Sequence, residues 1–252
     1  MNIGYWNINK KNNLTITPYI ISLLKDCKLD LLFLSEYENL NVYQLNNDIE
    51  KYGYNCIVGN VCEKVIMLKR QASDFYLPTE DERFIVAQSL KNKTTIVGLH
   101  LESQMIQNSD FNRMKTMSRI YDTIKSLREK YDNVVLVGDF NCLPTDRELL
   151  DKEKIQCIPY KEEVRNSKNN DIFYNPILLF LNETNKQYGS LRYVCNEYTL
   201  MWYPFDQVMV SKNLIDSINN IKYLKYVGNK SFVSKNDIPN ISDHLPLIFS
   251  IN

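Results

Sequence analysis

The sequence lacks several features that would place a protein in a specialised class. Thirty basic and thirty acidic residues cancel in a chain of 252, so no global positive charge marks a nucleic-acid binder, although a local basic patch would suffice. No run of about 18 apolar residues occurs, and we therefore expect no membrane span. Residues 3–9 already resemble a strand, which leaves no room for a signal peptide and predicts a cytoplasmic protein.

Cysteine pairs at zinc-binding spacing and flexible linkers are also missing. The six cysteines are scattered without a CxxC pair, at Cys27, Cys56, Cys62, Cys142, Cys157 and Cys195. We expect them to be free thiols in a reducing compartment. No tract rich in glycine, proline and serine divides the chain, and 44% of its residues are hydrophobic. A single domain over residues 1–252 is the prediction.

One stretch combines a buried strand with polar chemistry. Val134–Val137 is an unbroken apolar, mostly β-branched run, which favours a strand buried on both faces. Gly138 then allows close backbone approach, and Asp139 and Asn141 point to the same side if the strand continues that far. An acid and an amide so placed can share a metal, a water or a phosphate oxygen. A simple Asp/Asn turn that closes a core strand is an equally good interpretation of this stretch alone.

The same arrangement recurs elsewhere in the chain. Residues 29–34 form a second apolar run after a predicted helix, and Glu36 stands at its end. Residues 84–89 and 94–99 are predicted hairpin partners, and His100 ends the second of them. Buried strands that alternate with helices indicate an α/β layered architecture, in which ligand groups gather at strand ends.

Two predicted helices have recognisable starts. Thr17 and Pro18 suit an N-cap and the first helical position. Asp110 can cap the longest helix, residues 110–130, whose basic residues include Arg113 and Arg119. A solvated helix face is the favoured explanation of those charges, and a track for a phosphate backbone is the alternative.

Several acids and both histidines share a place at the ends of predicted strands: Glu36, His100, Asp139, Asn141, Asp206, Asp243 and His244. Each has an ordinary explanation when taken singly, since His100 can be a hydrogen-bonded core histidine and Asp206 can pair with a surface lysine. Asn7 can merely cap a strand. Taken together, oxygen ligands without a cysteine cluster describe a site for a hard cation, Mg²⁺ or Mn²⁺.

These residues stand within short motifs in a particular order: Trp6-Asn7-Ile8-Asn9, Ser35-Glu36, Gly98-Leu99-His100-Leu101, Gly138-Asp139-Phe140-Asn141, Asp206-Gln207-Val208-Met209-Val210-Ser211 and Ser242-Asp243-His244. In combination they resemble the endonuclease/exonuclease/phosphatase superfamily over nearly the whole chain. The resemblance implies a four-layered α/β (α+β) sandwich, in which two packed mixed β-sheets are flanked by helices.

The resemblance also implies roles for individual residues. The implied metal ligands are Glu36, Asn7, Asn9 and Asp243. The implied catalytic residues are Asp139, Asn141, Asp206, His244, His100 and Glu63. Asn7, Asn141 and Arg83 match phosphate-contacting positions. The sequence departs from the family pattern at Ser35, just before Glu36, where glutamine is frequent. In this scheme Asp206 supports His244, and Glu63 is the acidic partner of His100.

The fold family leaves the substrate open. A metal-dependent nuclease that acts on DNA or RNA is the leading hypothesis, because the pairing of His100 with Glu63 favours phosphodiesters. Tyr193 and Trp202 can stack nucleobases beside the cleft, but alternating sheet residues are the slightly preferred interpretation. A phosphatase or phosphodiesterase for a small nucleotide or phosphorylated metabolite is the second hypothesis. A non-catalytic binding module is the third.

Overall fold

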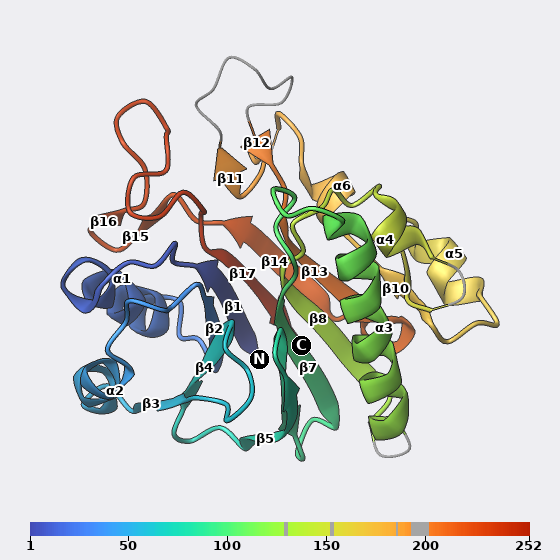
Figure 1. The fold of residues 1–252 in the computed structure, drawn as a ribbon, viewed down its shortest axis with the longest axis horizontal. Coiled ribbons are helices and arrows are strands. Elements are labelled where there is room, and N and C mark those ends of the chain that lie inside the picture. Colours follow the sequence, from blue (N-terminus) through green and yellow to red (C-terminus); the bar gives the residue numbers. More distant parts are fainter. Residues whose placement is uncertain (129–130, 152–153, 185, 193–201) are drawn as a thin grey trace.

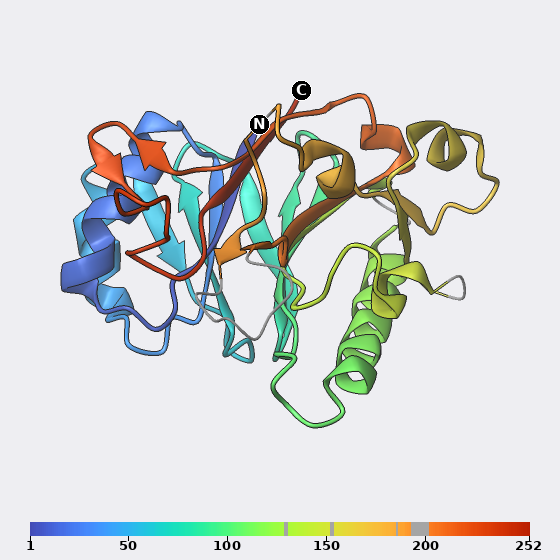
Figure 2. The same cartoon turned by 90° about the horizontal axis from the view of Figure 1, so that it is seen from above.

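Two mixed β-sheets pack face to face between outer layers of helix (Figure 1). The computed structural model describes residues 1–128, 131–151, 154–184, 186–192 and 202–252. Figure 2 shows the same layers from above, with α1 on one outer side and α3 on the other. The predicted four-layered sandwich is thereby confirmed. Among the described residues, no helix combines the length and apolarity needed to cross a membrane.

The first sheet has six strands and carries both chain ends. In order across the sheet they are β14 (Ile218–Tyr223), β17 (Leu247–Ile251), β1 (Asn2–Asn7), β2 (Leu31–Ser35), β4 (Val65–Arg70) and β3 (Tyr54–Ile57). Strand β1 runs parallel to β2 and antiparallel to β17. The outer face of this first sheet is covered by two helices, α1 (Asn13–Asp26) and α2 (Val42–Glu50).

The second sheet has seven strands. In order they are β5 (Phe75–Asp81), β6 (Phe84–Ser89), β7 (Thr94–His100), β8 (Asn133–Asp139), β13 (Asp206–Ser211), β10 (Ile172–Tyr174) and β9 (Gln156–Ile158). The long helix α3 (Ser109–Leu127) covers its outer face (Figure 1). The smaller elements are α4 (Arg147–Leu150), α5 (Lys161–Asn166), α6 (Ile177–Phe180), the 3₁₀ turn η1 (Lys212–Leu214), β11 (Leu191–Arg192) with β12 (Trp202–Tyr203), and β15 (Tyr226–Val227) with β16 (Lys230–Ser231).

Apolar side chains fill the spaces on both sides of the second sheet. Phe33, Ile96 and Val135 belong to the large cluster that includes the space between the sheets. Gly98 permits the close approach there, because a Cβ at this position would lie 2.2 Å from Cδ1 of Phe33. A second cluster packs α3 onto the outer face, with Ile120 against the sheet. Strand β8 is therefore buried from both sides, as its apolar run predicts.

Helix α1 starts earlier than predicted. Its N-cap is Asn12, whose side-chain oxygen accepts the backbone N–H of Thr15 at 3.2 Å, so the expected start at Thr17 is wrong. Pro18 lies inside the helix, on its exposed side. The core-facing residues Ile16 and Ile20 hold the helix through this position, because their burial stabilises it more than one lost backbone hydrogen bond costs.

A buried ion pair joins α3 to α4. Arg113 is 4% exposed, and its Nε donates to Oε1 of Glu148 at 2.8 Å. Its Nη1 also donates to the carbonyl of Glu102 at 3.1 Å. The interpretation of the α3 charges as a solvated face is therefore wrong for Arg113, which fixes the segment that follows β7.

Candidate active site

The second sheet aligns three of the predicted residues at one edge. Strands β7 and β8 are parallel, and their register places His100 beside Asp139. Strand β13 runs antiparallel to β8 and begins with Asp206 opposite the same Asp139. Because neighbouring strands lie about 4.8 Å apart, the register alone brings these three side chains together.

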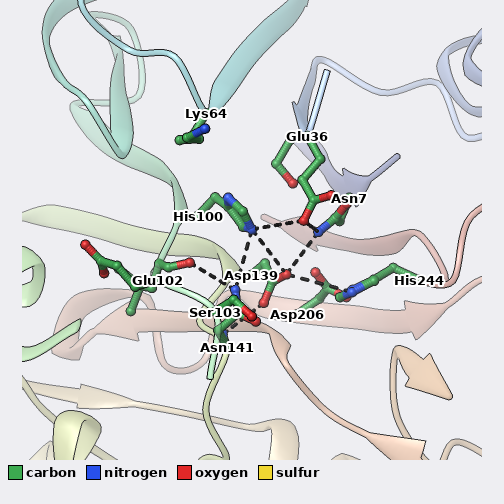
Figure 3. A network of polar contacts seen from close by, with 12 residues as sticks. Asn7, Glu36, Lys64, His100, Glu102, Ser103, Asp139, Asn141, Asp206 and His244 are labelled. Carbon is green, nitrogen blue, oxygen red and sulfur yellow. Dashed lines mark hydrogen bonds and ion pairs between the residues drawn. The ribbon is translucent and has the colours of Figure 1, made fainter. Parts of the chain in front are cut away.

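The first sheet supplies residues from the ends of β1 and β2. Asn7 pairs in register with Ser35, the residue before Glu36. The Asn7 amide Nδ2 donates to Oε1 of Glu36 at 3.2 Å and to Oδ2 of Asp139 at 3.1 Å. Asn7 therefore joins carboxylates from both sheets across the edge at which they meet (Figure 3).

Asp139 and Asn141 lie together, although β8 ends at Asp139. Asn141 has a φ of 50°, and its N–H donates to Oδ1 of Asp139 at 2.9 Å. Its Nδ2 donates to the carbonyl of Leu101 at 2.9 Å. Glu36 also has a positive φ, 52°. Such conformations cost roughly 1–3 kcal/mol and are concentrated at functional sites, so the turns after β8 and β2 both carry backbone strain here.

His244 and Asp206 form a buried ion pair. Nδ1 of His244 lies 2.7 Å from Oδ2 of Asp206, and its Nε2 lies 3.9 Å from Oδ2 of Asp139. Burial opposes a charge on the imidazole, but the Asp206 carboxylate outweighs it and raises the pKa of His244 to about 10. The ring is therefore a cation at neutral pH, and its Nε2–H is directed toward the cluster.

His100, in contrast to His244, is neutral. Its Nε2 lies 3.5 Å from Oε1 of Glu36, while its buried Nδ1 has no hydrogen-bond partner in the described part of the chain. Burial lowers the pKa of His100 to about 4, and the positive charges of Arg83 and Lys64 act in the same direction. Together these influences outweigh the Asp139 carboxylate, which favours the charged ring. The site thus holds one neutral and one charged imidazole, and two such groups can take different roles in proton transfer.

Comparison with known proteins agrees with this arrangement. A model of the Endonuclease/Exonuclease/phosphatase family matches residues 58–250, more than half of the chain. The chain belongs to that family. No curated protein matches it.

Three solved structures illustrate the likeness in fold. The 3′ phosphatase NExo from Neisseria, bound to a product DNA hairpin, is 16% identical with a TM-score of 0.60, covering 100% of this chain and 99% of that one. An AP endonuclease from Archaeoglobus fulgidus is 15% identical with a TM-score of 0.63, covering 100% and 99%. A humanized D. rerio TDP2 is 16% identical with a TM-score of 0.66, covering 100% and 98%.

In this member of the family, three further residues that the sequence predicted for the site lie at the rim of the cluster. The carbonyl of Arg83 accepts the N–H of His100 at 3.0 Å, and its Nε lies 3.6 Å from Oε1 of Glu102. Asp243 is exposed, and its charge acts on both Glu36 and His244. Asn9 contributes its backbone, because its N–H donates to Oδ1 of Asn7 at 2.9 Å.

Of the remaining predicted residues, Glu63 is not brought to the cluster. Glu63 is exposed and does not bond to His100, whose Nδ1 has no partner among the described residues. Trp202 lies in β12 and pairs with Arg192 of β11, whose guanidinium is 5.5 Å from its ring. The residue before Arg192, Leu191, forms a β-bridge with His244, so this pair of short strands adjoins the cluster. Tyr193 lies outside the described residues.

Lys64 is a site residue that the sequence analysis missed. It lies near His100 in Figure 3, and its charge acts on that imidazole. Its Nζ is 3.5 Å from Oε1 of Glu38, on a partly exposed surface. No pattern in the sequence distinguishes Lys64 from Glu63, because the choice depends on how the chain turns before β4.

Buried tyrosines support the cluster from behind. Tyr5 donates its hydroxyl to Oγ of Ser35 at 2.7 Å, next to Glu36. Tyr223 donates to the carbonyl of Asp206 at 2.6 Å. Burial, together with the charge of Asp206, raises the pKa of both phenols, so both remain neutral donors.

The donor set fits a hard cation. Burial raises the pKa of Glu36, and the neighbouring carboxylates Asp139 and Asp243 act in the same direction. A cation would relieve that repulsion, and the side chains around Glu36 offer mainly oxygen ligands, with the neutral Nε2 of His100 3.5 Å from Oε1 beside them. Asp139, Asp206 and His244 also come within 4.8 Å of one another, but the Asp206–His244 hydrogen bond already uses two of their ligand atoms.

Proposed function

We propose that residues 1–252 form a single-domain, divalent-metal-dependent phosphodiester hydrolase that acts on nucleic acid. The observation that carries the proposal is the cluster at the shared sheet edge, where a charged imidazole and several carboxylates converge. Metal-assisted in-line attack of water on a phosphodiester needs a base, a positive group beside the phosphoryl oxygens and a cation. The cluster offers a candidate for each.

Glu36 is the principal candidate ligand for Mg²⁺ or Mn²⁺, with Asp243, Asn7 and Asn9 around it. Its carboxylate is partly exposed, at 25%, so both an ion and a substrate can reach it. When bound, the ion neutralises charge that builds on the phosphoryl and leaving oxygens.

Asp139 is the candidate general base. Burial raises the pKa of this carboxyl, which strengthens it as a proton acceptor. Asn7 and Asn141 hold its two oxygens through hydrogen bonds of 3.1 and 2.9 Å, so the carboxylate is oriented before a substrate arrives. Such preorganisation removes the cost of reorienting the group during reaction.

His244 supplies positive charge and a hydrogen bond to the phosphoryl group. Asp206 keeps it protonated and fixes its ring through Nδ1. His100, held neutral, is a hydrogen-bonding group near the base and the metal ligand. Because a neutral imidazole is a poor acid, a water is the candidate proton donor for the leaving oxygen. Both roles follow from opposite environments around the two rings.

A nucleic-acid substrate is supported by two observations. Lys64 and Arg83 place basic groups beside His100, where phosphates that flank the reacting one can bind. The similar Neisseria phosphatase is bound to product DNA. We further propose a cytoplasmic setting, which the five described cysteines support because all are free thiols; Cys195 lies outside the described residues.

A substrate panel tests the proposal. Single-stranded and duplex DNA, RNA, mononucleotides and phosphorylated metabolites are incubated with Mg²⁺ or Mn²⁺, with chelator, and with the Asp139→Asn variant as control. We expect metal-dependent cleavage of a polynucleotide that chelator and Asp139→Asn both abolish. Cleavage of a small phosphoester alone would favour the phosphatase hypothesis, and binding without turnover would favour a binding module.

A further inference from the structure

A segment at the rim of the site exposes large apolar side chains. Residues 101–108 connect β7 to α3, and in the later part of this connection, residues 103–108, Met105 is 79% exposed and Ile106 48% exposed. Phe111, in the first turn of α3, is 65% exposed. Single exposed apolar residues are ordinary, but three within seven positions beside a candidate active site indicate a contact surface.

The segment is anchored to the catalytic cluster. Asn141 donates to the carbonyl of Leu101, and the buried Arg113 donates to the carbonyl of Glu102. Ile106 donates its N–H to the carbonyl of Ser103 at 3.1 Å, which closes a turn. The ends of such a turn lie within about 7 Å of each other, so Ile106 stays near Ser103, which Figure 3 draws beside the cluster.

The chemistry of this segment differs from that of a phosphate-binding surface. Residues 103–109 are Ser-Gln-Met-Ile-Gln-Asn-Ser and carry no charge. Apolar side chains contact the faces of nucleobases, and amides such as Gln104 and Gln107 hydrogen-bond base edges. Phosphates, by contrast, are usually bound by basic residues, which this site presents at Lys64 and Arg83.

We propose that residues 103–108 bind nucleobases adjacent to the scissile phosphodiester, with Met105 and Ile106 as the contacts. This inference rests on the proposed nuclease function and narrows it, because a substrate would then need bases beside the reacting phosphate. The apolar pair inserts against or between bases, as apolar wedges do in proteins that unstack nucleic acid. The basic groups near His100 bind the sugar-phosphate backbone.

The test compares strands with and without bases. The Met105→Ser/Ile106→Ser double variant is measured on an oligonucleotide, on the same oligonucleotide with abasic nucleotides around the cleaved bond, and on bis-para-nitrophenyl phosphate. Leu14→Ser is the matched control, since Leu14 is a large side chain 91% exposed on α1. A fluorescent adenine analogue in the strand reports unstacking directly.

We expect the double variant to raise KM for the base-bearing strand by roughly 5- to 100-fold. Its activity on the abasic strand and on the small diester should stay at the wild-type level, as should every activity of Leu14→Ser. The rise in analogue fluorescence on binding should be lost only in the double variant.

Equal losses on all three substrates would show a structural role for the segment and overturn the inference. Equal affinity of the wild-type protein for the base-bearing and the abasic strand would also overturn the inference. If the wild-type protein then bound lipid vesicles and the double variant did not, the segment would be assigned to a lipid surface. Binding is also measured by fluorescence anisotropy in the Asp139→Asn protein. Base-dependent binding without any wild-type hydrolysis would refute the proposed reaction while supporting the base contact.

Discussion

Replacement of Asp206 by asparagine tests the central ion pair of the site. Asp206 is fully buried, with Oδ2 2.7 Å from Nδ1 of His244. Its backbone accepts the Tyr223 hydroxyl at 2.6 Å and donates to Oγ of Ser190 at 3.1 Å, and neither contact depends on the side chain. Asp206→Asn therefore removes a charge while it preserves shape and the surrounding fold.

The expected effect follows from the two opposing influences on His244. Burial alone lowers the pKa of this imidazole below its ordinary 6.5, and the Asp206 carboxylate raises it to about 10. Without the Asp206 carboxylate the pKa of His244 falls, because only Asp139 and Asp243 then act against burial. Loss of one preorganised electrostatic group, or of the carboxylate that orients a histidine, costs about 10²–10⁴ in kcat. KM should change little, because the contact strengthens as charge develops.

Steady-state kinetics on the substrate that the panel identifies measures kcat and KM, and NMR titration follows the His244 ring. Asp74→Asn is the control: Asp74 accepts a hydrogen bond from Ser89, which lies at the end of β6 opposite the one beside His100. A folded Asp206→Asn protein with wild-type kcat would refute the reasoning. An unchanged pKa of His244 in that variant would contradict the electrostatic explanation even if kcat fell.

Three further predictions concern the metal, a loop and a buried pair. Glu36→Gln should raise the Mg²⁺ concentration for half-maximal activity by at least about tenfold, since mutation even of a ligand's supporting group costs 10–100-fold; an unchanged value in a metal titration would remove Glu36 as a ligand. Glu80 accepts hydrogen bonds from the N–H groups of residues 60, 61 and 62 at 2.7–3.0 Å. Glu80→Gln should therefore lower the free energy of unfolding, measured in urea, by about 1–3 kcal/mol. An unchanged free energy of unfolding would show that these hydrogen bonds are dispensable. Arg113→Met should cost about 3–5 kcal/mol by leaving Glu148 buried and unpaired; added Glu148→Leu should restore much of it, and an undiminished loss in the double variant would refute the pairing.

Some features of this protein follow from short stretches of sequence. The run Val134–Val137 predicts a buried strand, and the structure has one from Asn133 to Asp139. The hairpin of residues 84–89 and 94–99 is also confirmed. Apolar runs and turn residues act over a few positions, so strands and their polar ends are legible locally. The helix start at Thr17 failed because Asn12 offered an equally good cap where the core-facing pattern already begins.

The motif order goes further, since it implied the sandwich and the residues that meet at its edge. It did not separate Lys64 from Glu63, because which of the two lies near His100 depends on how the chain turns from β3 into β4. Only the tertiary structure decided the charge states of the two histidines. Each depends on burial and on partners far away in the chain, such as Asp206 for His244, and electrostatic energies at such sites follow distance and solvent exclusion, not sequence proximity.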